Sequence, residues 1–236
     1  MEIKSIQELL DAHLRQQNLE GLEARRDGKF HPSAFGQCFR KQYWLRQGVE
    51  PTNPNDERTL RVFACGHLFH DLIQGLIPDK QTEVKVLTDD ISGSADIVTE
   101  DCVWDIKSIH SKGFFYMDAA HYDVKKEKRT NWLQVATYAN ILGKSKIRLV
   151  FVSKDDLLIK EYGDLTANWY ADIDEEIRTL INFWKDQTVP PPAQPRAYGA
   201  TEFGVSGECS RYCQFRDKCF SLENYTPEPV KKKEKK

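Results

Sequence analysis

The chain has 236 residues, of which 40% are apolar and 30% charged, so it is long enough for one large domain or two small ones. No apolar run reaches the roughly eighteen residues of a membrane-spanning helix, and the polar, amphipathic N-terminus differs from a signal peptide, so we expect a cytoplasmic protein. The net charge of −2 excludes a uniformly basic nucleic-acid-binding protein but permits local basic patches.

The hydrophobic pattern predicts helices in the first third of the chain. They are expected over residues 1–30, 33–48 and 59–77, where apolar residues recur at helical spacing and glycine or proline marks the end. The segment VEPTNPNDE, between the second and third helices, is rich in turn-forming residues and predicts a loop.

The remainder predicts a sheet interrupted by helices. A long aromatic and basic connection leads into a helix expected at 131–142, and an amphipathic helix is expected at 165–188. Strands are expected at 81–88, at two places within 92–108, at 146–153 and at 157–164. This order predicts an α/β fold in which helices flank a small mixed central sheet.

The stretch SGSADIVTEDCVWDIKS, residues 92–108, places charges among apolar strand residues. A two-residue turn at positions 100 and 101 would set Asp96 directly opposite Asp105, on the face that also carries Lys107. Facing carboxylates repel each other, but a divalent cation such as Mg²⁺ reverses the sign of that interaction. An exposed hairpin with a surface ion pair explains the spacing equally well, because a one-residue shift in register breaks the geometry.

Asp96, eight intervening residues and then Asp105-Ile106-Lys107 resemble the signature of PD-(D/E)XK nucleases, with Asp in place of the commoner Glu. The resemblance implies a restriction-endonuclease-like core. In it, the two aspartates and the carbonyl of Ile106 hold Mg²⁺ or Mn²⁺, and Lys107 acts on the attacking water or the phosphate. Glu83, in the preceding strand, is either another acidic group of this site or an exposed strand residue.

Two helical motifs resemble elements of the RecB-like branch of these nucleases. Gly66 and His70 in GHLFH match its Gly-x-x-x-His element, whose histidine joins the metal site, and His67 lies one turn away. Gln134 and Tyr138 in QVATY match its Gln-x-x-x-Tyr element, in which the pair orients catalytic groups and substrate. Without this context, the histidine would be interpreted as a partly exposed helix residue and the tyrosine as a core residue.

Four of the six cysteines fall at two distant places, Cys38 first and then Cys209, Cys213 and Cys219. This distribution resembles the iron–sulfur members of the RecB-like group, which include CRISPR-associated and AddB-type nucleases. The resemblance implies that the four thiolates hold a [4Fe–4S] cluster. The late spacing departs slightly from CxxCx5C, and a structural Zn²⁺ is the alternative.

These motifs predict four parts of the chain. Residues 1–58 form an N-terminal helical region that contributes one cluster cysteine, and residues 59–188 form the nuclease core. Residues 189–222 form a linker and a C-terminal cluster segment, joined to the N-terminal region through the cysteines. Residues 223–236 form a charged, disordered tail.

We therefore expect a metal-dependent DNA exonuclease that acts at free ends or on single strands, in recombination and repair, phage DNA processing or CRISPR adaptation. The alternatives are a structure-selective endonuclease of the same fold and an inactive module that binds DNA ends. A homo-oligomer or a nucleic-acid-processing protein partner is compatible with either. Residues of basic or aromatic character that we expect to contact DNA are Arg40, Lys41, Tyr43, Lys125, Lys126, Lys128 and Arg129.

Overall fold

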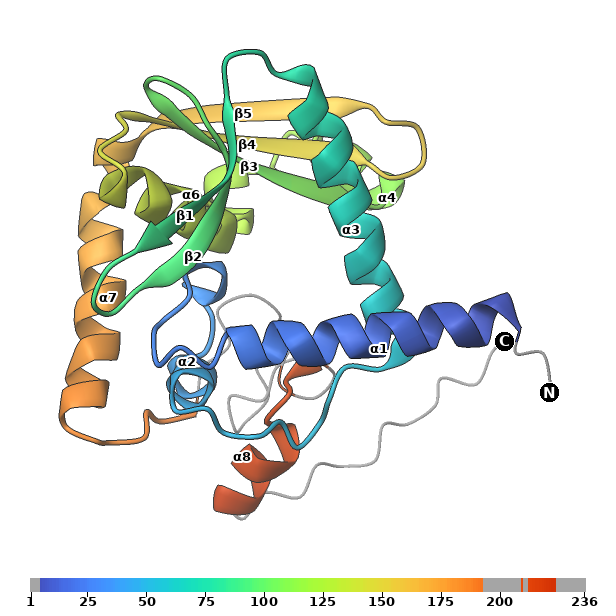
Figure 1. The fold of residues 1–236 in the computed structure, drawn as a ribbon. Coiled ribbons are helices and arrows are strands. Elements are labelled where there is room, and N and C mark those ends of the chain that lie inside the picture. Colours follow the sequence, from blue (N-terminus) through green and yellow to red (C-terminus); the bar gives the residue numbers. More distant parts are fainter. Residues whose placement is uncertain (1–4, 193–208, 210–211, 224–236) are drawn as a thin grey trace.

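The computed structural model describes residues 5–192, 209 and 212–223 (Figure 1). At its centre is a five-stranded sheet with the order β1-β2-β3-β4-β5. β3 and β4 run parallel, and the other neighbouring strands are antiparallel. The predicted α/β fold with a mixed sheet is confirmed. The strands are β1 (Gln81–Leu87), β2 (Ser92–Val98), β3 (Cys102–Ile109), β4 (Lys146–Ser153) and β5 (Ile159–Leu165).

Helices lie on both sides of this sheet, and the basic connection after β3 holds two short ones that the sequence did not indicate. The α-helices are α1 (Ile6–Ala24), α2 (Phe39–Arg46), α3 (Glu57–Leu76), α4 (Ser111–Tyr116), α5 (Val124–Glu127), α6 (Arg129–Ile141), α7 (Tyr170–Lys185) and α8 (Arg216–Leu222). Two 3-10 helices, η1 (Pro32–Ala34) and η2 (Thr166–Trp169), complete the elements discussed below.

Three predicted helices are shorter than expected. α1 ends well before Gly28, whose φ is +70°, and regular helix resumes only at α2, after Gly36 with φ +73°. Both glycines hold a left-handed conformation that L side chains rarely adopt, so the chain turns there instead of continuing as helix. The stretch expected as one helix at 165–188 starts with η2, and α7 follows it.

β3 and β4 are largely buried on both faces, because their alternating side chains enter two separate cores. On one face, Val103 and Leu149 pack with residues of α6 and α7 in the larger core. On the other face, Ile106 and Val150 pack with Ile73 of α3 in a smaller one. The centre of β3 is therefore enclosed between α6 and α3, which fixes the positions of its charged residues.

The N-terminal region packs directly on the larger core. Phe30 and Phe35 belong to that core, and Phe30 pairs with Ile91 through an isolated parallel bridge. The Gly36 N–H donates to Oε1 of the buried Glu176 on α7 at 2.8 Å. A Cβ atom on Gly36 would lie 3.1 Å from Thr130 Cγ2, so this glycine also permits the close approach to α6.

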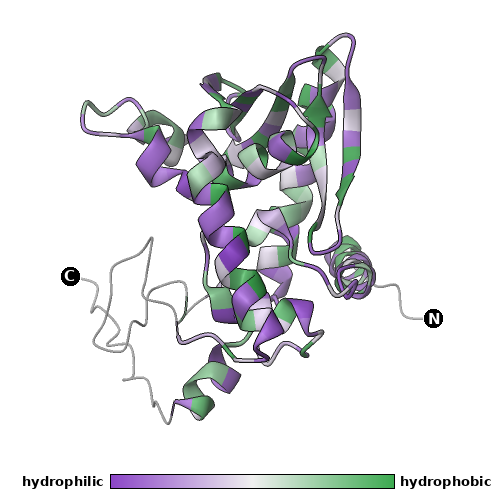
Figure 2. Ribbon diagram, turned by 90° about the vertical axis from the view of Figure 1, so that its left-hand side faces the viewer, coloured by the Kyte–Doolittle hydropathy of each residue, from purple (hydrophilic) through white to green (hydrophobic). Residues whose placement is uncertain are grey.

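The outer surface is mixed. α7 lies on the side that faces the viewer in Figure 2, where hydrophilic and hydrophobic stretches follow each other along its ribbon, and its residues Ile173 and Leu180 are buried. In the part of the chain that the structure describes, no helix is both long and apolar enough to cross a membrane.

We expect Gly36→Ala to destabilise the fold more than Gly28→Ala. Both substitutions force an L residue into a left-handed backbone, at a cost of roughly 1–3 kcal/mol. Only Gly36 adds a clash, since no atom lies within 4 Å of a Cβ built on Gly28. Urea unfolding of both variants measures the difference. Equal losses in the free energy of unfolding would show that the contact between Gly36 and α6 is not tight.

Candidate active site and cysteine site

The β2–β3 hairpin adopts the predicted register. Val98 pairs with Val103 and Ile97 with Trp104, and the Thr99 N–H donates to the carbonyl of Cys102 at 2.9 Å. Among the described residues, this pairing stops there and does not continue to Asp96 and Asp105.

Where the backbone pairing of β2 and β3 ends, the side chain of Asp96 accepts the next hydrogen bond from β3. Its Oδ2 atom accepts a hydrogen bond of 2.7 Å from the N–H of Ile106, in place of a backbone carbonyl. The amide that donates this bond is the one that links Asp105 to Ile106. The carboxylate of Asp96 therefore lies beside the backbone of Asp105, at the opening of the hairpin.

Two further elements bring ligand-type side chains to Asp96. His70 on α3 places Nδ1 3.5 Å from Asp96 Oδ2, and Glu83 on β1 reaches the same place. One potential ligand atom from each of His70, Glu83 and Asp96 lies within 4.8 Å of the others. His67 is exposed, with its ring 6.4 Å from that of His70. Of the two histidines, His70 is the one at the acidic group, where the sequence motif placed it.

Asp105 is almost fully buried, with 2% of its surface exposed, and its Oδ1 atom lies 2.7 Å from Lys107 Nζ. Its other oxygen, Oδ2, is buried and has no hydrogen-bond partner within the described residues. An unsatisfied buried carboxylate oxygen is costly. A hard divalent cation, which takes oxygen ligands, fits this donor set.

The electrostatics of these groups follow from burial and from one another. Burial raises the pKa of Asp105 to about 6, helped by the charge of Asp96 and opposed by Lys107. Burial also raises the pKa of Asp96, against Lys107 and the hydrogen bond from Ile106. Burial and the charge of Lys107 lower the pKa of His70, so its imidazole is neutral and able to bind a metal. Although burial favours its neutral form, the two carboxylates raise the pKa of Lys107.

α6 brings Gln134 and Tyr138 to the same place. Burial raises the pKa of Tyr138, and the charges of Asp105 and Asp96 raise it further, while a hydrogen bond with Gln134 lowers it. The Tyr138 hydroxyl is therefore neutral, and it lies close enough to the two carboxylates for their charges to raise its pKa. The structure thus brings Gln134 and Tyr138 together with the acidic residues.

Three residues that sequence reasoning missed support this arrangement. Gln74 Nε2 donates both to Glu83 Oε1 at 2.8 Å and to the carbonyl of Asp96 at 3.0 Å. Ser94 Oγ donates to Glu83 Oε2 at 2.9 Å. Gly93 allows Tyr138 to approach, because a Cβ there would lie 2.6 Å from Tyr138 Oη. The available signals were a polar residue one turn after His70 and a glycine inside a strand.

The cysteines meet where α2 lies beside the C-terminal segment. Burial raises the pKa of Cys213 to about 11, and the neighbouring thiols of Cys38 and Cys209 raise it further. Cys219 Sγ accepts a hydrogen bond of 3.2 Å from Arg40 Nη1 on α2. Cys38 thus lies near Cys209 and Cys213, and Cys219 packs with Cys213 against the small core of Tyr43, Trp44 and Phe215. Within the described residues, no three of the four cysteine sulfurs form a group as compact as the one around His70.

Two residues expected to contact DNA have structural roles instead. Arg40 is 4% exposed, and it donates to the Pro190 carbonyl and to Glu223 at 2.7 Å each. Tyr43 is 2% exposed, with its ring 5.4 Å from that of Trp184. Because both side chains are buried, their position contradicts a direct contact with DNA. Arg40 joins α2 to Pro190 and Glu223, and Tyr43 packs in the core between α2 and α7.

The remaining basic candidates lie near the surface. Lys41 bonds Gln37 Oε1 at 3.0 Å, and Lys128 is partly buried over the ring of Phe151. The other three form ion pairs: Lys125 with Asp164 at 2.6 Å, Arg129 with Asp172 at 2.6 Å, and Lys126 with Asp123 at 3.6 Å. Lys126 is the most exposed of these, with 83% of its side chain accessible. The predicted tail at 223–236 lies outside the described residues except for Glu223.

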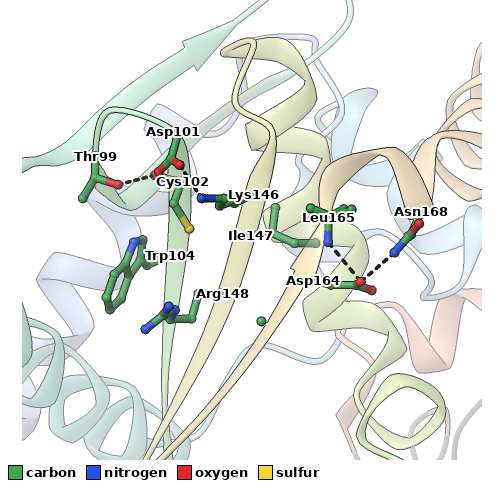
Figure 3. A pocket seen from close by; sticks show the side chains of 11 residues that line it. Thr99, Asp101, Cys102, Trp104, Lys146, Ile147, Arg148, Asp164, Leu165 and Asn168 are labelled. Carbon is green, nitrogen blue, oxygen red and sulfur yellow. Dashed lines mark hydrogen bonds and ion pairs between the residues drawn. The ribbon is translucent and has the colours of Figure 1, made fainter.

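A pocket of about 500 Å³ opens at the start of β3 and β4, and none of the predicted active-site residues lines it (Figure 3). Its charged groups are already paired. Lys146 lies 2.7 Å from Asp101, and Arg148 bonds Glu161 at 2.6 Å and stacks on Trp104. The pocket is therefore separate from the candidate active site.

Solved structures share this fold. The alkaline exonuclease LHK-Exo of Laribacter hongkongensis has a TM-score of 0.51 at 14% identity, over 71% of this chain and 93% of its own. Its complex with dAMP gives the same values. The protein SSO0001 has a TM-score of 0.52 at 16% identity, over 92% of this chain and 96% of its own. No protein-family model and no curated protein matches the sequence. This chain therefore has the fold of these proteins.

We expect cation binding to weaken as the pH falls through about 6, because protons then compete for Asp105, whose pKa lies near that value. Without a cation, the raised pKa of Asp105 also affects the free energy of unfolding, which is then larger at low pH. The folded state holds the proton more tightly than the unfolded one, so stability falls as the pH rises from about 4 to about 6. Calorimetric Mn²⁺ titrations and thermal melts across this range measure both effects. In Asp105→Asn both steps should disappear, and a step that persists would assign it to another group.

Proposed function

We propose that this protein is a divalent-metal-dependent deoxyribonuclease of the PD-(D/E)XK superfamily and its RecB-like branch. The observation that carries the proposal is the buried Asp105 at the opening of the β2–β3 hairpin. Its Oδ2 atom has no hydrogen-bond partner among the described residues. Its Oδ1 atom is paired with Lys107, and the charge of Asp96 raises the pKa of Asp105. A site built only for stability has no use for such a group.

In this proposal Asp96, Asp105, His70 and the carbonyl of Ile106 would hold Mg²⁺ or Mn²⁺. When bound, the cation supplies charge stabilisation at the phosphoryl group and lowers the pKa of a bound water. Lys107, with 28% of its side chain exposed, reaches solvent and can orient the water or neutralise phosphate charge.

The residues of α6 support the same chemistry from the other side. Because its pKa is raised, Tyr138 stays neutral and its hydroxyl can donate a hydrogen bond to the substrate, and Gln134 helps to hold that hydroxyl in place. Gly93 keeps space for the tyrosine ring. These residues would position the substrate and do not themselves hold the cation.

We propose exonuclease action at DNA ends or on single strands. The support is the fold shared with LHK-Exo, an alkaline exonuclease with a solved dAMP complex, which suggests a nucleotide product. Exposed aromatic rings on α4, those of Phe115 and Tyr116, are of the kind on which unpaired bases stack. Recombination and repair, phage DNA processing and CRISPR adaptation are all settings for such an activity, alone or with a protein partner.

We propose further that the four cysteines hold a [4Fe–4S] cluster. The mutual influence of the thiols of Cys38, Cys209 and Cys213 supports a shared site. A structural Zn²⁺ held by the same thiolates is the alternative.

We expect Asp105→Asn to lower DNA hydrolysis by about three orders of magnitude, because a metal ligand contributes several kcal/mol to stabilising the transition state. Asp101→Asn, at the exposed turn of the same hairpin, is the matched control and should retain full activity. End-labelled DNA with and without Mn²⁺ provides the assay. Full activity of Asp105→Asn would contradict the proposed nuclease, whereas loss of hydrolysis with retained DNA binding supports it over an inactive binding module.

Circular single-stranded DNA separates the two nuclease alternatives. A strict exonuclease leaves the circle intact and degrades the same molecule once it is linearised. A structure-selective endonuclease of this fold would cut the circle at junctions or hairpins. Comparing both substrates on one gel decides between them.

We expect Cys213→Ser to lose bound iron and to lower the melting temperature of the anaerobically purified protein, because metal-binding energy adds to folding energy. Cys65→Ser, at an exposed position on α3, is the control and should change neither property. Iron analysis and visible absorption of both variants measure the effect. Zinc in place of iron in the unmodified protein would select the alternative metal.

A further inference from the structure

Lys128, at the start of α6, differs from the basic residues on either side of it. Lys125 and Arg129 each lie 2.6 Å from a carboxylate, that of Asp164 and that of Asp172. The ammonium group of Lys128, by contrast, has neither a hydrogen bond nor an ion pair within the described residues. Its side chain is only partly exposed, so it carries a half-buried positive charge with no carboxylate in contact.

The ammonium group of Lys128 lies over the sheet, beside the candidate active site. Its Nζ atom is 5.8 Å from the centre of the Phe151 ring on β4. Phe151 pairs with Lys107 in the parallel register of β3 and β4. Neighbouring strands lie about 4.8 Å apart, so the two paired side chains are neighbours on one face of the sheet. Lys128 is therefore one strand further along that face than Lys107, on the side away from the β2–β3 hairpin.

Resting on the proposed function, we infer that Lys128 binds the DNA phosphate next to the one that is cleaved. The cleaved phosphate would lie at Asp105 and Lys107 on β3, and Lys128 would hold the neighbouring phosphate over β4. The DNA backbone would then cross the sheet in the direction from β3 to β5. Lys128 touches the substrate away from the reacting atoms, so its contribution is to hold the strand in register with the active site.

The surroundings of Lys128 explain why an anion is the partner that fits. Burial lowers the pKa of Lys128, and the nearby Glu127 opposes this effect without reversing it. An ammonium group that is partly desolvated and unpaired carries a cost that a contacting anion offsets. The Phe151 ring offsets little of this cost, because 5.8 Å is close to the limit of about 6 Å for a cation–π contact. A phosphate oxygen supplies the full negative charge that the described residues do not place there.

Aromatic rings continue from this position toward the surface. The Phe151 ring meets that of Tyr162 on β5 edge-on, with 6.0 Å between the ring centres. Besides burial and Glu127, the hydroxyl of Tyr162 raises the pKa of Tyr122, so these two tyrosines are close. Tyr122 in turn lies 5.6 Å from the ring of Tyr116 on α4, which is 55% exposed. A strand held at the proposed phosphate position can therefore stack a base on α4.

DNA binding by the full-length Asp105→Asn protein, in which hydrolysis is slowed, tests the inference. The probe is a short, labelled single strand in which one linkage is a neutral methylphosphonate, placed at each position in turn. The products of the unmodified protein identify the linkage that is cleaved.

Adding Lys128→Met should weaken binding of the all-phosphate strand about tenfold and reduce the dependence of log Kd on log salt concentration by roughly 0.7, the value for one phosphate contact on a single strand. A neutral linkage beside the cleaved one should weaken binding by the same factor when Lys128 is present. In Lys128→Met the same neutral linkage should cause no further loss, because the contact is already gone.

Lys144→Met is the matched control. Lys144 is also partly buried, but it lies before the start of β4 and bonds the Glu100 carbonyl at 2.9 Å. This variant should bind every strand as its Asp105→Asn parent does. Lys128→Arg keeps the charge and should retain both the salt dependence and the response to the neutral linkage. That result guards against a folding defect in Lys128→Met.

Unchanged binding in Lys128→Met, an equal loss at every linkage, or a response confined to the cleaved linkage would each overturn the inference. In all three cases, hydrolysis by the unmodified protein would leave the proposed function intact. A response confined to one linkage, in a protein that never hydrolyses DNA, would support the phosphate contact and overturn the proposed function.

Discussion

A side chain takes the place of a backbone carbonyl at the centre of this molecule, where Asp96 accepts the N–H of Ile106. Hydrogen bonds to charged groups contribute about 1.5–3 kcal/mol, enough to compete with the next rung of a β ladder. The ladder between β2 and β3 ends there, and the hairpin opens toward α3. This opening allows His70 and Gln74 on the helix to reach the strand residues.

The largely buried charged side chains of Asp96, Asp105 and Lys107 lie together at this opening, and the packing around them fixes their positions. β3 lies between a large core shared with α6 and α7 and a smaller core shared with α3. Lys107 offsets part of the charge of Asp105, but the raised pKa values of Asp96 and Asp105 show that the fold does not fully compensate for it. Buried charged groups with such perturbed pKa values lower the stability of a fold and are common at functional sites.

Much of this could be predicted from the sequence, because alternation along strands and helical spacing are local properties. The strands, the register at Ile97 and Trp104, and the positions of His70 and Tyr138 all follow from such patterns. What could not be predicted depends on contacts between distant elements. Arg40 looked like a DNA contact because its chemistry suits one, and only the fold shows that its partners are Pro190, Glu223 and Cys219. The support of Glu83 by Gln74 and Ser94 likewise needs three elements to be placed before it can be seen.

The C-terminal helix α8 gives the molecule a particular order of assembly. Asp217 bonds Asn53 through both its side chain and its backbone across 164 residues, and Phe215 packs on Trp44. On the ribosome, Asn53 and Trp44 are made long before these partners exist. The face of Trp44 that packs on Phe215 therefore stays uncovered until residue 215 has been made, whereas Tyr43 of the same helix finds its partner Trp184 on α7 earlier.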